Sequence, residues 1–374
     1  MQNDTSAVQP DPDDSDEASL WFLPGPVEDE DATTNTSLPW PVADQTDLLD
    51  SVAWQRAEAT QAVALARAAA VLGALDERLR ASTEGLRQRL GLLEVTELSW
   101  HAGDRIPADR LALYHALRLS GAQTDSLALA RAGWAYRRLT SGPGPIGSAD
   151  GAPVPSAPAD PSDAAEIMGQ SGSPSALDAF LGRKTAPDSP DPDTRQWQAL
   201  LNGAHGLHSL TAAAMCYHAG RIIAGTIGMA GREMIEAAVV AARMAARDTR
   251  GGLMFVPLAL GGVSALQARG SIEERLTGWY IGVERSGLAA LMHLDRLAEW
   301  HARVTRATAH LSGRTPPQLV QVLADWPLVS AAMAEAQTGA SRAAVQRNLA
   351  MLENEGLIRE VTGQGRYRFW TAAL

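Results

Sequence analysis

The sequence is poor in several residues that define common protein classes. Its 374 residues include one cysteine, one lysine and only 5 % aromatic residues. The single Cys216 excludes an intramolecular disulfide and any metal site built on a cluster of cysteines. The low aromatic content favours a mainly helical protein over a β-sandwich. Because Lys184 is the only lysine, arginine carries nearly all of the positive charge.

The chain also lacks the segments that direct proteins into or across membranes. No cationic stretch followed by an apolar stretch opens it, so no secretory signal is expected. The most apolar window, residues 199–230, is interrupted by His205, His208, His218 and Arg221. Such a window predicts a buried helix and not a membrane span. We therefore expect a cytoplasmic protein without a membrane partner.

Basic residues are missing from the first 55 positions, which hold 13 acidic residues before the first base, Arg56. The formal net charge of −11 comes from this segment, because the remainder has 32 basic and 30 acidic residues. A balanced remainder does not argue against nucleic-acid binding. Residues 1–46 are rich in Asp, Pro, Ser and Thr and are predicted to be a disordered acidic tail. The tail either keeps the protein soluble or competes with DNA for arginines.

A first helical block is predicted over residues 47–140. Apolar residues recur there at the spacing of one helical face, in two successive sets: Leu65, Ala68, Leu72, Leu75 and Leu79, then Leu86, Leu90 and Leu93. Gly103 and Pro107 predict a turn before a further helix, and Thr124-Asp125 predicts the cap of a helix that reaches Arg138. Residues 141–194 are rich in Pro, Gly, Ser and Ala and are predicted to be a flexible linker.

A second helical block is predicted over residues 195–314. Within it, Gly251 to Gly262 is expected to be a buried loop or a short extended piece. An apolar seam then predicts one long helix or two in series, through Leu276, Tyr280, Val283, Gly287, Leu291, Leu294 and Ala298. This seam is either core of the same chain or the contact face of a homodimer.

The last segment, residues 315–374, carries the most informative pattern. Pro316-Pro317 opens a helix that Trp326-Pro327 stops, and a second helix is predicted over residues 329–337, with Val329, Ala332, Met333 and Ala336 facing inward. Thr338-Gly339-Ala340 is a tight turn, and Ser341 is placed to cap a third helix that ends near Asn354. That helix is expected to bury Val345, Leu349 and Leu352. A β-hairpin is predicted from residues 357–361 and 366–370.

This order of elements resembles the bacterial winged-helix family, over about 60 residues. The resemblance implies a recognition helix, residues 341–354, that lies in the major groove of double-stranded DNA. Its DNA-binding residues would be Ser341, Arg342, Gln346 and Arg347 in the helix and Arg366 and Arg368 in the wing. The segment has five Arg and five acidic residues, but every Arg lies on the third helix or the hairpin. Glu353, Glu355 and Glu360 lie there too and oppose DNA binding.

The sequence predicts no enzymatic function. His205, His208 and His218 lack carboxylate partners at ligand spacing, so no metal or cofactor is expected. The helical layout is distantly similar to that of Fic-type nucleotidyl transferases, whose motif is His-Pro-Phe-x-(Asp/Glu)-Gly-Asn-Gly-Arg. The best alignment puts Ala224 at the histidine, Gly228 at the acid and Ala230 at the asparagine. Only Gly231-Arg232 matches, so the resemblance implies a catalytically inactive layout.

The whole chain also resembles an alphaproteobacterial family of helix-turn-helix proteins of unknown function. The segments that carry this resemblance are Leu75-Asp-Glu-Arg-Leu79, Leu98-Ser-Trp-His-Ala-Gly-Asp-Arg105, Asp109-Arg-Leu-Ala-Leu113, Leu117-Arg-Leu-Ser-Gly121 and Arg137-Arg-Leu-Thr140. The sequence therefore predicts a mainly α protein with a helical body in two blocks and a C-terminal winged helix. The function expected is DNA binding, as in a transcriptional regulator. The alternative is a protein-interaction scaffold whose winged helix binds a partner protein.

Overall fold

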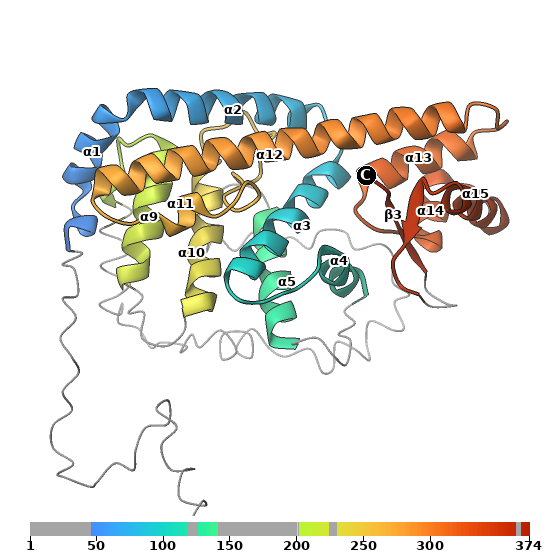
Figure 1. The fold of residues 1–374 in the computed structure, drawn as a ribbon, viewed down its shortest axis with the longest axis horizontal. Helices are drawn as coiled ribbons and strands as arrows, with labels where there is room; N and C mark the ends of the chain where they lie inside the picture. Colours follow the sequence, from blue (N-terminus) through green and yellow to red (C-terminus); the bar gives the residue numbers. More distant parts are fainter. Residues whose placement is uncertain (1–45, 118–125, 141–199, 201, 224–229, 364–367) are drawn as a thin grey trace, which may run out of the picture. The chain divides into compact units, whose positions relative to one another are not determined.

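The computed structural model describes residues 46–117, 126–140, 200, 202–223, 230–363 and 368–374 (Figure 1). These residues are mainly helical, with a small antiparallel sheet near the C-terminus, as predicted. Several predictions fall outside the described residues: the acidic tail up to residue 45, the cap at Thr124-Asp125, the linker 141–194, the Fic-like alignment at residues 224–228, and Arg366.

The first helical block contains one short 3-10 helix and five α-helices among its described residues. They are η1 (Thr46–Leu49), α1 (Ser51–Thr60), α2 (Ala62–Arg80), α3 (Glu84–His101), α4 (Ala108–Leu117) and α5 (Ser126–Thr140). The apolar face predicted for α2 is confirmed, because Ala68, Leu72, Leu75 and Leu79 are all buried. Helix α3 is surrounded on most sides. Of its predicted residues Leu90 is buried and Leu86 and Leu93 are partly exposed, while Leu92, Val95 and Leu98 are buried as well.

The second block contributes α9 (Ser209–Ile223), α10 (Ala230–Ala245), α11 (Ser264–Gln267) and α12 (Ile272–Ala307). Helix α12 is one continuous helix of 36 residues. Ser271 starts it with a capping box, in which its hydroxyl accepts from the Glu274 N–H and the Glu274 carboxylate accepts from the Ser271 N–H. Residues of both helical blocks share one hydrophobic core.

The apolar seam of α12 packs inside the chain. Leu276, Tyr280, Val283, Gly287 and Leu294 are buried, whereas Ala298 is exposed. A Cβ atom built on Gly287 would lie 2.7 Å from the Val71 side chain of α2, so this glycine lets the two helices approach closely. Of the two interpretations left open by the sequence, the structure supports intramolecular core. The seam therefore gives no support to a homodimer.

The glycine-flanked segment 251–262 is a buried loop and contains no strand. Two buried carboxylates that are distant from it in sequence accept hydrogen bonds from its backbone. Asp76 accepts from the N–H groups of Arg250 and Leu253, both at 2.8 Å. Glu94 accepts from three consecutive N–H groups, at 2.8, 2.9 and 3.0 Å, in Leu258, Ala259 and Leu260. The amides of Leu253, Leu258 and Ala259 are thus paired although they are buried from water.

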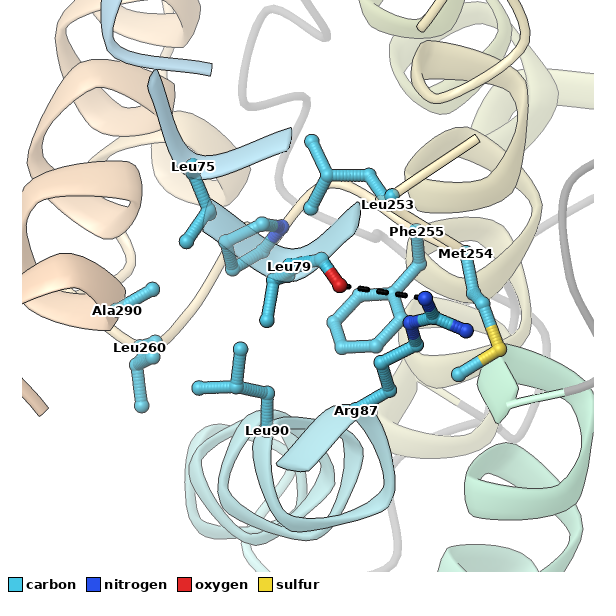
Figure 2. Close-up of a pocket in the computed structure, with 11 residues that line it drawn as sticks. Leu75, Leu79, Arg87, Leu90, Leu253, Met254, Phe255, Leu260 and Ala290 are labelled. Atoms are coloured by element: carbon cyan, nitrogen blue, oxygen red, sulfur yellow. Dashed lines mark hydrogen bonds between the residues drawn. The ribbon is translucent and has the colours of Figure 1, made fainter. Parts of the chain in front are cut away.

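Beneath this loop lies an apolar cavity of about 10 Å³. Figure 2 shows Leu75, Leu79 and Leu90 on one side and Leu253 and Phe255 on the other. Such a volume holds about one water molecule. In this conformation the cavity is therefore a packing void and not a ligand pocket.

No single described helix is both long enough and apolar enough to cross a bilayer. Helices α1 and α2 meet the length and composition criteria only as a pair, and they are bent by 84° relative to each other.

The C-terminal segment folds as α13 (Thr315–Asp325), β1 (Val329–Ser330), α14 (Ala331–Thr338), α15 (Arg342–Asn354), β2 (Ile358–Glu360) and β3 (Phe369–Ala372). The strands form one antiparallel sheet in the order β1-β3-β2. The predicted hairpin is present, with Glu360 opposite Trp370 and Ile358 opposite Ala372. Strand β3 ends two residues later than the sequence predicted.

The second helix of this segment differs from the prediction. Val329 does not begin the helix but pairs with Trp370 in β1. Ser330 caps α14 instead, since its hydroxyl accepts from the Met333 N–H at 3.1 Å. The helix thus starts at residue 331, and Ala334 is buried while Ala332 and Ala336 are exposed. The inward face was predicted wrongly because Val329 was counted into the helical period.

Substitution of Glu94 by alanine tests the role of the buried carboxylate. It leaves two buried N–H groups and one partly buried N–H group unpaired, and each buried one costs roughly 1–3 kcal/mol. We expect a loss of several kcal/mol in the free energy of unfolding, measured by urea denaturation. Glu94→Gln keeps one acceptor oxygen and should lose less. Equal stability of Glu94→Ala and the unsubstituted protein would contradict this role.

The pH dependence of stability gives a second test of the same carboxylate. Burial raises the pKa of Glu94 to about 7, against the opposing effect of the three N–H donors. The folded chain then binds a proton here at a higher pH than the unfolded chain does. Its contribution to stability is full below about pH 4.5 and is lost as the pH rises to about 7, by at most ~1.4 kcal/mol per pH unit. Glu94→Gln should lack this part of the pH profile between pH 5 and 7.

Candidate nucleic-acid interface

The turn between α14 and α15 is built from three local interactions. Gly339 adopts the left-handed conformation, with φ +64°, that ends α14. The Thr338 hydroxyl donates to the Ala334 carbonyl at 2.6 Å and accepts from the Ala340 N–H at 3.3 Å. The Ser341 hydroxyl then caps α15 by accepting from the Ala344 N–H at 3.4 Å. Together they set the angle between the two helices of the helix-turn-helix.

Helix α15 has one buried face and one exposed face, as the sequence predicted. Val345, Leu349 and Leu352 are at most 1 % exposed. Ser341, Arg342, Gln346 and Arg347 are all exposed. The structure therefore brings the predicted helix residues together on one side of the N-terminal half of α15.

Two alanines on the same exposed face were not singled out from the sequence. Ala343 and Ala350 are both exposed and lie among the polar residues of α15. Their short side chains let the backbone of a helix come close to a flat or grooved partner. The helical spacing of the buried residues predicts that both alanines are exposed, because both positions fall between the buried ones.

Among the described residues, the positive charge of this face is only weakly compensated. The Arg342 side chain is 75 % exposed, and its contact with the carboxylate of Glu335 is 3.9 Å long. An exposed ion pair at this distance contributes little. Arg342 can therefore turn to another anion at low energetic cost.

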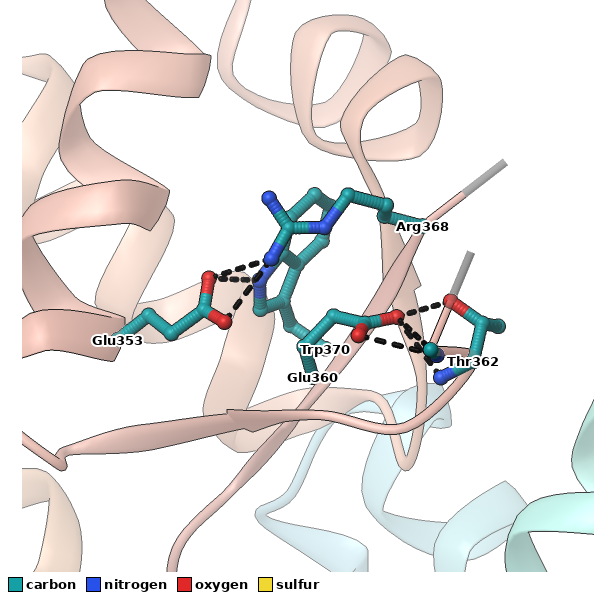
Figure 3. A network of polar contacts seen from close by, with 6 residues as sticks. Glu353, Glu360, Thr362, Arg368 and Trp370 are labelled. Carbon is teal, nitrogen blue, oxygen red and sulfur yellow. Dashed lines mark hydrogen bonds and ion pairs between the residues drawn. The ribbon is translucent and has the colours of Figure 1, made fainter. Parts of the chain in front are cut away.

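The wing arginine Arg368 is held by neighbours, which the sequence did not predict. Its Nη2 donates to both carboxylate oxygens of Glu353 at 2.9 Å. Its guanidinium lies over the Trp370 ring, 4.9 Å from the ring centroid. The Trp370 Nε1–H also donates to Glu353, at 3.0 Å (Figure 3). Arg368 thus has a fixed position at the base of the wing, where β3 begins next to the end of α15.

The second wing acid is also engaged internally. The Glu360 carboxylate accepts from the N–H groups of Thr362 and Gly363 and from the Thr362 hydroxyl (Figure 3). Partial burial disfavours the charged form of Glu360, but these hydrogen bonds and the Arg368 charge outweigh it and lower the pKa. Glu353 and Glu360 therefore serve the structure of the wing, which weakens the argument they raised against DNA binding. Glu355 is exposed.

The helical body holds this segment through α12 and α3. Leu297, Trp300 and Val304 of α12 belong to the same apolar core as the helices of the winged segment. The Trp300 Nε1–H donates to the Leu357 carbonyl at 2.7 Å, just before β2. Because these contacts involve buried groups, the segment that contains α15 has a defined place on the body.

Arg89 of α3 makes the second connection. Its Nη2 donates to the carbonyls of Leu323 and Trp326, at 3.0 and 2.6 Å, where α13 ends. Burial lowers the pKa of Arg89 to about 10, opposed by the nearby Asp325 carboxylate. A cation at the C-terminal end of a helix pairs with carbonyls that the helix leaves free. In the sequence, an arginine among the leucines of α3 indicates a candidate for a buried cation, but it does not indicate which group the arginine binds.

Comparison with known proteins supports the interpretation of this segment. Residues 316–372 match the family model described as HTH DNA binding domain. The match begins inside α13 and ends at the last residue of β3, so it spans the whole helix-turn-helix and its sheet. None of the curated proteins matches the chain. The C-terminal segment is thus a helix-turn-helix DNA-binding domain.

Substitution of Glu353 by alanine tests the polar network of the wing. It removes the acceptor of Arg368 and of the Trp370 indole, so we expect a loss of about 1–3 kcal/mol in the free energy of unfolding. The matched control is Glu355→Ala, which removes an exposed carboxylate two residues away and should change stability by less than about 0.5 kcal/mol. Equal losses in the two variants would show that the network does not stabilise the wing.

Proposed function

We propose that the protein is a transcriptional regulator that binds double-stranded DNA in a sequence-dependent way. The single observation that carries this proposal is the exposed face of α15, on which Arg342, Gln346 and Arg347 stand within a helix-turn-helix DNA-binding domain. We further propose that it acts in the cytoplasm by binding and not by catalysis.

In this proposal the N-terminal half of α15 enters the major groove. Arginine side chains match the two acceptors of guanine, and glutamine matches the donor and acceptor of adenine. Arg342, Arg347 and Gln346 would take these roles. The Ser341 end of α15, with its N–H groups and positive helix dipole, would face a phosphate.

The wing would meet the flanking backbone or the minor groove. Arg368 uses one nitrogen, Nη2, for Glu353. A guanidinium carries five N–H donors, so Nε and Nη1 stay available for a phosphate. The pair with Glu353 would then orient Arg368 for contact and would not have to break. Arg366 would extend the same contact along the wing.

The alternative is a scaffold whose winged helix binds a partner protein. The exposed face of α15 is compatible with this function, because helix-turn-helix domains also bind proteins. Salt dependence separates the two functions. Phosphate contacts release counterions, so DNA affinity falls steeply as salt rises, and a neutral protein interface does not respond to the same degree.

The deciding experiment is selection of genomic fragments by the full chain at two salt concentrations. We expect discrete fragments to be enriched, with less retention at the higher salt. Arg342→Ala/Arg347→Ala should weaken binding to an enriched site at least about 30-fold, because each base contact contributes about 1–3 kcal/mol.

Arg110→Ala is the control, since it removes an exposed arginine from α4 in the helical body. It should bind as the unsubstituted chain does. Failure to retain DNA even at low salt would refute the proposal and favour the interaction scaffold. Undiminished binding by the double variant would instead refute the assignment of α15 as the reading helix.

A further inference from the structure

Two helices of the body carry exposed apolar side chains where a monomer would be expected to carry charge. On α12, Ile281, Leu288 and Met292 are 38 %, 45 % and 56 % exposed. Their spacing of seven and four residues places all three along one line of the helix. On α2, Val63 is 71 % exposed, and three exposed alanines follow it at helical spacing, Ala66, Ala70 and Ala74.

The start of α2 is apolar beyond the needs of its own core. Between residues 62 and 74 the only charged residue is Arg67. The buried side of this stretch uses Ala68 and Leu72, and Val63, Ala66, Ala70 and Ala74 are left exposed. Single exposed apolar residues are ordinary, but a continuous patch marks an interaction surface. We call this patch the outer face; it consists of Val63, Ala66, Ala70 and Ala74 of α2 and Ile281, Leu288 and Met292 of α12.

The two halves of the outer face form one surface. Figure 1 shows α2 and α12 running side by side in the same direction. Close contact of Gly287 with Val71 and Leu72 sets their register. Exposed Arg78 of α2 and exposed Asp295 of α12 form an ion pair at 3.1 Å, with side chains 48 % and 61 % exposed. Because this bridge joins the solvent sides of the helices, their exposed apolar residues lie on the same side.

The order of charged residues along α2 also indicates which kind of partner the outer face can bind. Arg67 lies five residues before Leu72, and Glu77 lies five residues after it. When a copy of α2 packs antiparallel and the two-fold axis lies at the level of Leu72, Arg67 stands at the level of Glu77 of the copy. Leu288 follows Gly287 and therefore lies near the same centre, where it would meet its own copy. A Cβ atom built on Gly73 meets nothing within 4 Å, so close approach is open there.

We infer that the outer face of α2 and α12 binds a second copy of this chain, across a two-fold axis at the level of Leu72 and Leu288. Such an isologous contact must be self-complementary. The exposed charges around the face allow this because they are of both signs: Arg67, Arg78 and Arg285 are positive, and Glu77 and Asp295 are negative. A face of mixed sign does not suit a strongly charged partner such as nucleic acid or an anionic membrane. The contact is independent of DNA binding.

Light scattering and a cysteine substitution test the inference without DNA. The full chain at about 10 µM should have twice its monomer mass of 39.6 kDa. Leu288→Cys should form a covalent dimer under mild oxidation, because the two thiols meet at the two-fold axis. The natural Cys216 is 1 % exposed and should contribute no background. Leu127→Cys is the control, since Leu127 of α5 is 48 % exposed but lies away from the outer face.

Charge exchange gives an independent readout. Arg67→Glu places like charges at one level of the interface and should shift the chain toward monomer, and Arg67→Glu/Glu77→Arg should restore the dimer. A monomer in light scattering, or cross-linking of Leu288→Cys no faster than that of Leu127→Cys, would overturn the inference. A dimer that tolerates Arg67→Glu and does not cross-link through residue 288 would assign dimerisation to another surface, and it too would overturn the inference.

Discussion

The continuity of α12 is the constraint on which the rest of the described structure depends. Its first half packs in the core of the helical body, and its second half supplies Leu297, Trp300 and Val304 to the core of the DNA-binding domain. Because a continuous helix is held by one unbroken series of backbone hydrogen bonds, it fixes the position of whatever packs on one half relative to whatever packs on the other. Helix α15 is therefore placed relative to the body by packing and not by a tether.

Polar side chains determine which elements pack together more specifically than apolar contacts do. Asp76 and Glu94 bind the amides of the loop 251–262, and Arg89 binds the carbonyls at the end of α13. In the wing, Glu353 joins the end of α15 to β3 through Arg368 and Trp370. In each case a charged group meets backbone or side-chain partners that only one arrangement of the elements provides. Glu353 and Glu360, two of the three acids that oppose DNA binding in the sequence, have such structural roles.

The sequence predicted what depends on neighbours along the chain. Helical spacing identified the buried side of α2 and both faces of α15, and Gly339 and Ser341 marked the turn and the cap. It did not predict contacts between distant residues. Strand β1 needs Trp370, 41 positions after Val329, and Glu94 needs amides more than 160 positions away. Arg368 was predicted to contact DNA, and its pairing with Glu353 was not predicted because it depends on how β3 meets α15.

The core shared along α12 also bears on how this domain could be exchanged in evolution. Many helix-turn-helix domains are joined to their bodies by a linker, and such a domain can move between proteins as a unit. Here, separation at residue 315 would expose the indole of Trp300 and its apolar neighbours on the body and would remove part of the core of the domain. Body and domain must therefore change together, and a substitution at their junction in one is tolerated only with a matching substitution in the other.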